Sequence, residues 1–141
     1  MPNAGEATMT TEKERPYRLA VVGPCSAGKT TLVQALRAAG YETRHVAQEH
    51  SYVPDMWQRI SRPDLLIFLD VDYATALARR PTTTGGPERM AQQRVRLAHA
   101  RQHCHFYLDT SLLMPEEVRQ RVMAFLQQMG APPPLEVQDA H

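Results

Sequence analysis

The chain has 141 residues, of which 43% are hydrophobic and 22% are charged, and its formal net charge is +1 at pH 7. This length favours one domain, and the near-neutral charge excludes a broad attraction to nucleic acid or to an anionic membrane surface. No apolar run approaches the roughly 18 residues of a membrane span, and a secretory signal is lacking, so we expect a cytoplasmic protein with reduced thiols at Cys25 and Cys104.

Polar composition marks both ends of the chain as flexible tails. Residues 1–15 contain almost no large apolar side chain, so burial cannot offset the entropy lost on ordering. Residues 131–141 begin with Ala131 and three successive prolines, which lack backbone donors and favour an extended chain. We therefore expect the folded domain to span residues 16–130.

Between these tails, short apolar runs alternate with helical periodicity, which is typical of an α/β domain with a mostly parallel sheet. Strands are expected at residues 19–22, 41–46, 65–69 and 106–108. Helices are expected at residues 31–39, 73–80, 88–103 and 115–129, with Asp72 capping the second. The predicted fold is a three-layer sandwich with a sheet of about four strands in the order 2-1-3-4.

Residues 23–30, Gly-Pro-Cys-Ser-Ala-Gly-Lys-Thr, join the first expected strand to the first expected helix. Their spacing, Gly-x4-Gly-Lys-Thr, is that of the phosphate-binding loop called Walker A. The glycines let the backbone curl so that its amide hydrogens point at phosphate oxygens, at the positive end of the following helix. Lys29 is expected to reach the β- and γ-phosphates, and Thr30 to place its hydroxyl on Mg²⁺. The expected nucleotide contacts are Gly23, Pro24, Cys25, Ser26, Ala27, Gly28, Lys29, Thr30 and Thr31.

Two absent segments narrow the class of nucleotide protein. The chain has no Asn/Thr-Lys-x-Asp segment for reading guanine and no Leu-Ser-Gly-Gly-Gln segment of transporter ATPases. These absences favour ATP over GTP, and small-molecule kinases over switch proteins and transporters. The expected cofactors are ATP and Mg²⁺.

Over most of residues 16–130 the chain resembles the nucleoside and nucleotide kinase-like group of P-loop proteins. The resemblance rests on the loop, on residues 62–80 with the run Asp-Leu-Leu-Ile-Phe-Leu-Asp, on the arginine-rich helix 89–101, and on residues 107–118. It implies that the arginine-rich helix forms a lid whose Arg94 and Arg101 approach the phosphates, although an exposed basic helix is the simpler alternative. It also implies that the turn 109–112, including Thr110 and Ser111, touches the adenine.

Residues 47–64 are shorter than the helical substrate-binding region that such kinases usually insert at this point, so the acceptor stays open. Glu49 follows the second strand and would lie at the carboxyl edge of the sheet. There it could hold the water shell of Mg²⁺ or accept a proton from an attacking hydroxyl; the alternative is a solvated loop acid. Asp70 ends the most apolar strand and is a second candidate for the Mg²⁺ shell.

Zinc ligation is a further alternative for His99, His103, Cys104 and His105, since the first two share a helical face. Histidines at a helix end, favoured by the helix dipole, are the simpler interpretation.

The favoured hypothesis is a kinase that transfers the γ-phosphate of MgATP to an unidentified small acceptor. The alternatives are an ATP-binding regulatory or accessory module, and a slow NTPase whose site a partner protein completes. A protein partner or a second copy of the chain is compatible with the sequence, whereas nucleic-acid and membrane partners are not expected.

Overall fold

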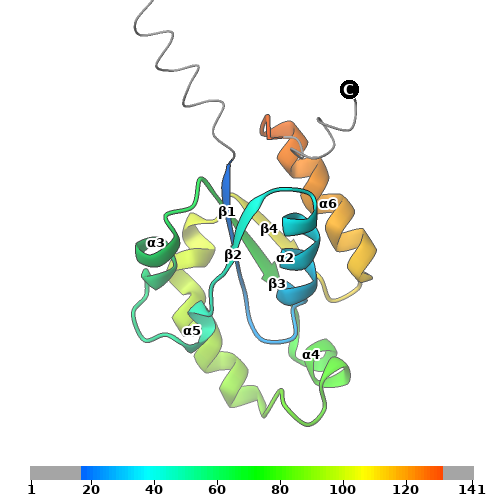
Figure 1. The fold of residues 1–141 in the computed structure, drawn as a ribbon. Helices are drawn as coiled ribbons and strands as arrows, with labels where there is room; N and C mark the ends of the chain where they lie inside the picture. The colour runs from blue at the N-terminus through cyan, green and yellow to red at the C-terminus, as the bar shows by residue number, and fades with distance from the viewer. Residues whose placement is uncertain (1–16, 132–141) are drawn as a thin grey trace, which may run out of the picture.

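The computed structural model describes residues 17–131, which form a parallel sheet covered by helices on both faces (Figure 1). The expected tail 1–15 and nearly all of the expected tail 131–141 lie outside the described residues. The strands are β1 (Arg18–Val22), β2 (Glu42–His45), β3 (Leu65–Asp70) and β4 (Phe106–Asp109). They pair in parallel in the order β2-β1-β3-β4, which confirms the predicted fold class and strand order.

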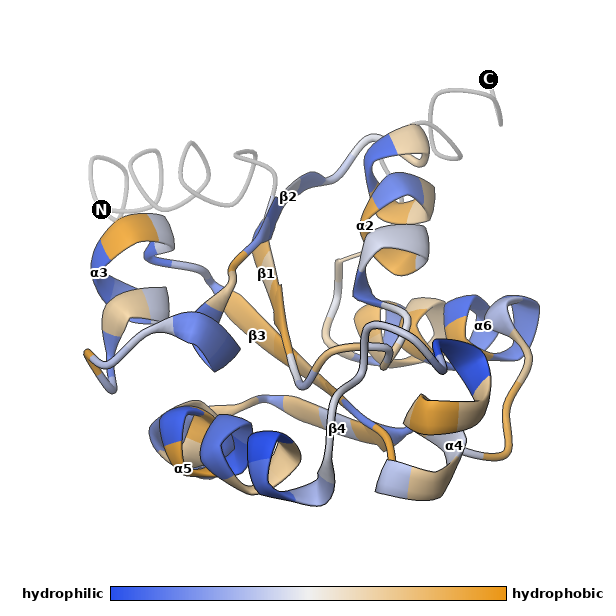
Figure 2. Cartoon of the chain, turned by 90° about the horizontal axis from the view of Figure 1, so that it is seen from below, coloured by the Kyte–Doolittle hydropathy of each residue, from blue (hydrophilic) through white to orange (hydrophobic). Residues whose placement is uncertain are grey.

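The helices form two layers, one on each face of the sheet. Helices α2 (Lys29–Ala38) and α6 (Pro115–Gln128) lie on one side, and α3 (Met56–Ser61) and α5 (Pro87–His103) lie on the other (Figures 1 and 2). The remaining helices, η1 (Gln48–His50) and α4 (Tyr73–Arg79), are short, as is α3. Because both faces are covered, β3 is buried at every residue and is apolar up to Asp70.

Successive residues of β1 point to opposite faces of the sheet, as in any pleated strand, so they contribute to two separate hydrophobic cores. Leu19 and Val21 join the cluster beneath α2 and α6. Ala20 and Val22 join the cluster that includes Trp57 of α3 and Leu97 of α5. Among the described residues, no helix is both long enough and apolar enough to cross a membrane.

The elements differ from the expectations by more than one residue in two places. Helix α2 begins at Lys29, before the expected start at residue 31, because the Gly-x4-Gly-Lys-Thr motif runs directly into its first turn. Residues 47–64, for which the sequence predicted no element, contain η1 and α3. In α3 the buried residue is Trp57 alone. A single buried position forms no helical stripe, so the sequence pattern does not reveal this helix.

Candidate functional site

The candidate site lies at the carboxyl ends of β1, β3 and β4. The chain leaves β1 through the loop 23–28, and β1 lies between β2 and β3. Since the helices that follow β1 and β2 pack on opposite faces of the sheet, the crevice at the end of β1 is a topological switch point. In open α/β sheets such a crevice is the usual ligand site.

The loop runs close against the neighbouring strand. Gly23 has a φ of 152°, and a Cβ placed on it would lie 1.9 Å from the carbonyl oxygen of Leu69. Gly28 and Ser26 have positive φ values of 95° and 70°. The glycine at position 23 is therefore required by the approach to β3 as well as by the backbone curl.

Side chains from α4 and from the end of β4 hold the loop in this shape. The Thr110 hydroxyl lies 2.9 Å from the carbonyl oxygens of both Ala27 and Asp70 and can donate to either. Arg79 donates to the carbonyl oxygen of Ser26 at 2.9 Å and to the Thr110 hydroxyl at 3.2 Å. Thr110, an expected nucleotide contact, is thus buried behind the loop, with 1% of its surface exposed.

The first turn of α2 is open to an anion. Its N-cap is Gly28, which has no side chain to cap the helix, and the turn contains no acidic residue. Gly28, Thr30 and Thr31 are exposed at its surface. The positive end of the helix is therefore available to a ligand, as an anion site requires.

Lys29 folds back into its own loop. Its Nζ donates to the carbonyl oxygens of Gly23 at 2.7 Å and Pro24 at 2.9 Å, and to Glu49 Oε2 at 2.9 Å. An ammonium has three protons, so all of its donors are used. Burial and then the positive charge of Lys29 lower the pKa of His45, at the end of β2. To reach a phosphate, Lys29 must exchange at least one of its three partners.

Glu49 is buried beside Lys29, with 4% of its surface exposed, and is not a solvated loop acid. Gln48 fixes its position: Gln48 donates to the carbonyl oxygen of Val53 at 2.8 Å and accepts from the Trp57 amide at 2.8 Å. Arg96 donates to the Glu49 carbonyl oxygen at 3.3 Å. Among the described residues, Glu49 Oε1 is a buried side-chain oxygen without a hydrogen-bond partner.

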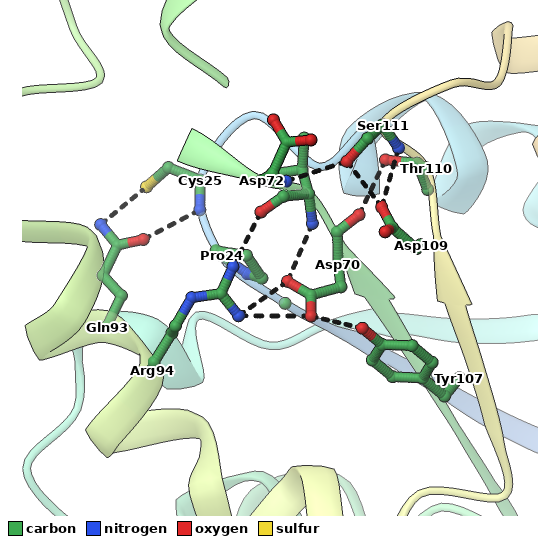
Figure 3. A network of polar contacts seen from close by, with 12 residues as sticks. Pro24, Cys25, Asp70, Asp72, Gln93, Arg94, Tyr107, Asp109, Thr110 and Ser111 are labelled. Carbon is green, nitrogen blue, oxygen red and sulfur yellow. Dashed lines mark hydrogen bonds and ion pairs between the residues drawn. The ribbon is translucent and has the colours of Figure 1, made fainter. Parts of the chain in front are cut away.

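Asp70 belongs to a network on the α5 side of the sheet (Figure 3). Arg94 contacts both of its carboxylate oxygens, at 3.1 and 3.3 Å, and Tyr107 donates to Oδ2 at 2.6 Å. Burial, and then the hydrogen bond to Asp70, raise the pKa of Tyr107 to about 12. The guanidinium of Arg101 lies over the Tyr107 ring, 3.7 Å from its centroid. The structure thus pairs Asp70 with Arg94, and Arg101 approaches them through Tyr107. Among the described residues, these three side chains contact this network and Val71 rather than the loop.

The contact between α5 and the loop is made by Gln93, next to Arg94. Its Oε1 accepts from the Cys25 amide at 3.0 Å, and its Nε2 donates to Cys25 Sγ at 3.3 Å (Figure 3). Sequence reasoning did not select Gln93. The feature of the sequence that could have identified Gln93 is its position on the buried stripe of α5, where the other residues are Met90, Leu97 and Ala100. Arg79 was also missed, because nothing in the pattern separates it from Arg80.

A pocket of about 710 Å³ opens beside the loop. It brings together the expected contacts Ser26, Ala27 and Gly28 of the loop, Thr31 of α2, and Thr110 and Ser111 of the turn after β4. Leu32, Ala35 and Leu113 give it an apolar wall, and Arg79 and Arg80 also line it. Its volume lies in the range of about 300–1,000 Å³ that is usual for small-molecule sites.

The four residues considered as zinc ligands do not converge on one point. His99 Nδ1 lies 3.1 Å from Trp57 Nε1, and His105 Nδ1 lies 2.8 Å from the Leu66 amide. Both nitrogens are acceptors in these bonds. Within residues 17–131, the group whose ligand atoms do converge is Cys25, which belongs to the Gly-x4-Gly-Lys-Thr motif, with Glu49 and His50.

A scan against models of known protein families and a search of curated proteins found no match to this chain.

Proposed function

We propose that this chain binds MgATP at residues 23–31 and transfers the γ-phosphate to a small acceptor. The observation that carries this proposal is the pocket of about 710 Å³ that shares Ser26, Ala27 and Gly28 with the phosphate-binding motif. A nucleotide needs a phosphate cradle joined to a pocket for its base, and the apolar wall at Leu32 and Leu113 suits a flat base. The resemblance to nucleoside and nucleotide kinases supports the same arrangement.

The residues at the other end of the loop suit the phosphates. The open first turn of α2 offers amide donors, and Lys29 offers a positive charge once it gives up a loop carbonyl. The exposed hydroxyl of Thr30 would hold Mg²⁺, an ion that screens the charge of the β- and γ-phosphates when bound.

Glu49 is the residue best placed to assist transfer. Its carboxylate is 2.9 Å from Nζ of Lys29, the residue expected to reach the γ-phosphate, so Glu49 would lie close to that phosphate. It could accept the proton of an attacking hydroxyl or a hydrogen bond from a metal-bound water. Asp70 is a weaker Mg²⁺ candidate, because Arg94 and Tyr107 already occupy its oxygens.

One observation favours the alternative of an ATP-binding module without its own acceptor site. Residues 47–64 pack against the rest of the domain: Gln48 is fully buried and Trp57 is 4% exposed. The cavity beside Trp57, also lined by Pro63 and His103, includes no residue of the phosphate-binding motif. A slow NTPase completed by a partner protein would fit the same observation.

Thermal unfolding with and without MgATP tests the binding step. At a nucleotide concentration of about 100 times Kd, binding adds about 2.7 kcal/mol and raises Tm by several degrees. We expect this shift with MgATP, a smaller one with MgGTP, and no shift in the double variant Lys29→Met, Glu49→Gln. The double variant removes both partners of the buried pair, because removing Lys29 alone would leave a buried charge that costs about 3–5 kcal/mol.

Arg121→Met, which removes one exposed positive charge from α6, is the matched control and should keep the shift. A Tm shift as large in the double variant as in the wild type would show that the nucleotide does not bind at this site.

Phosphate transfer is then tested with nucleosides, nucleotides and sugars as acceptors. Binding without turnover on any of them would favour the accessory module, and turnover that survives Glu49→Gln would remove Glu49 from the mechanism.

A further inference from the structure

Three side chains of different chemistry meet beside the phosphate-binding motif: Cys25 from the loop, and Glu49 and His50 from η1. Cys25 Sγ lies 3.6 Å from His50 Nε2 and 4.0 Å from Glu49 Oε2. His50 Nε2 lies 3.8 Å from Glu49 Oε2. The three atoms therefore form a nearly equilateral triangle.

This triangle is close to the one that a bound zinc ion imposes. Zinc binds sulfur at about 2.3 Å and nitrogen or oxygen at about 2.0–2.1 Å, and tetrahedral angles then separate the ligand atoms by about 3.3–3.6 Å. The observed separations exceed these by half an ångström or less at each edge. Side-chain rotations alone can close such a gap.

The surroundings of the triangle also suit a metal. Glu49 Oε1 is buried and unpartnered among the described residues, and a buried oxygen without a donor is costly unless a ligand satisfies it. Gln93 Nε2 donates to Cys25 Sγ at 3.3 Å, which is the support that a metal-bound thiolate receives from outside its ligand shell. The His50 side chain is 49% exposed, which leaves an entry path from solvent.

We propose that Cys25, Glu49 and His50 bind Zn²⁺ or a similar thiophilic divalent cation, with the fourth position open to water. On binding, the Cys25 thiol releases its proton to solvent and a sulfur–metal bond forms. Glu49 offers Oε2, or its free Oε1 while Oε2 stays on Lys29. Thiolate and imidazole select such a cation against Mg²⁺, which prefers oxygen ligands. This site goes beyond the proposed function and does not require nucleotide binding.

Titration of the nucleotide-free protein with Co²⁺, an optical substitute for Zn²⁺, tests the proposal. We expect one equivalent to produce a thiolate-to-cobalt charge-transfer band, which Zn²⁺ removes and excess Mg²⁺ leaves unchanged. Cys25→Ser should abolish the band, and Cys104→Ser, the matched control, should keep it. His50→Ala should weaken Co²⁺ binding more than tenfold, because even partners outside a ligand shell contribute about 10–100-fold.

A second measurement uses the wild-type protein and does not depend on the folding of any variant. Zn²⁺ should slow the alkylation of Cys25, followed by mass spectrometry, and leave that of Cys104 unchanged. The proposal is wrong if wild type shows no band at one equivalent, if the band survives Cys25→Ser, or if Zn²⁺ protects both thiols equally. None of these outcomes depends on whether the protein binds ATP.

Discussion

At the scale of single residues, Gly23 shows how close packing selects an amino acid. The backbone leaves β1 in a conformation that side chains rarely adopt, and the carbonyl of Leu69 occupies the space of a Cβ. Gly130, after α6, also has a positive φ, of 77°, but nothing lies within 4 Å of its Cβ position. Substitutions at the two glycines can therefore be compared to separate the free-energy cost of backbone strain from that of a steric clash.

We predict that Gly23→Ala destabilises the protein by about 3 kcal/mol or more, because strain and overpacking add. Gly130→Ala should cost only about 1–2 kcal/mol, from backbone strain alone. Urea unfolding of both variants measures the difference. Equal costs would mean that the loop moves away from β3 without penalty.

At the scale of elements, Gln48 joins η1 to α3 and α5. It has no exposed surface, and it bonds the Trp57 amide and the carbonyl oxygens of Val53 and Arg96. Residues 47–64 therefore depend on one polar side chain as well as on apolar contacts. The position of Glu49 beside Lys29 follows from this anchoring.

We predict that Gln48→Leu costs about 1–3 kcal/mol, because it leaves the buried Trp57 amide without its acceptor and takes one donor from each of the part-buried carbonyl oxygens of Val53 and Arg96. Trp57 is the single tryptophan of the chain, so its fluorescence reports on α3 directly. Its emission should shift to the red in Gln48→Leu and stay unchanged in Gln92→Leu, a control at an exposed position of α5. An unchanged emission in both variants would show that apolar packing alone holds the segment.

At the scale of the whole molecule, the sheet separates two hydrophobic cores. Val122 of α6 is fully buried in one cluster, and Val46, just after β2, is 1% exposed in the other. Since buried residues on opposite faces share no direct partner, their contributions to stability should be independent.

We predict that Val46→Ala and Val122→Ala each cost about 2 kcal/mol, and that the double variant costs their sum within about 0.5 kcal/mol. Urea unfolding of the three variants provides the test. An interaction energy above about 1 kcal/mol between the two substitutions would show that a cavity on one face of the sheet changes the packing on the other face.

The sequence by itself determined the architecture of this domain. Apolar runs such as residues 65–69 and helical stripes such as that of α6 are local patterns, and their alternation predicts a parallel sheet with helices on both faces. The strand order β2-β1-β3-β4 agreed with that prediction. The Gly-x4-Gly-Lys-Thr motif was also visible, because its parts lie within eight consecutive residues.

Only the tertiary structure decided which side chains meet. Nothing local indicates that Asp70 is paired with Arg94 and Tyr107, that Gln93 holds Cys25, or that Lys29 reaches Glu49. Such partners are separated by 20 or more residues along the chain, and their distances depend on how helices and strands pack. A sequence pattern indicates which face of an element is buried. It does not indicate which charged side chains pair, because pairing depends on which side chains lie close together in the folded protein. The motif at residues 23–30 was therefore predictable, but the contacts that occupy Lys29 and the approach of Glu49 and His50 to Cys25 were not.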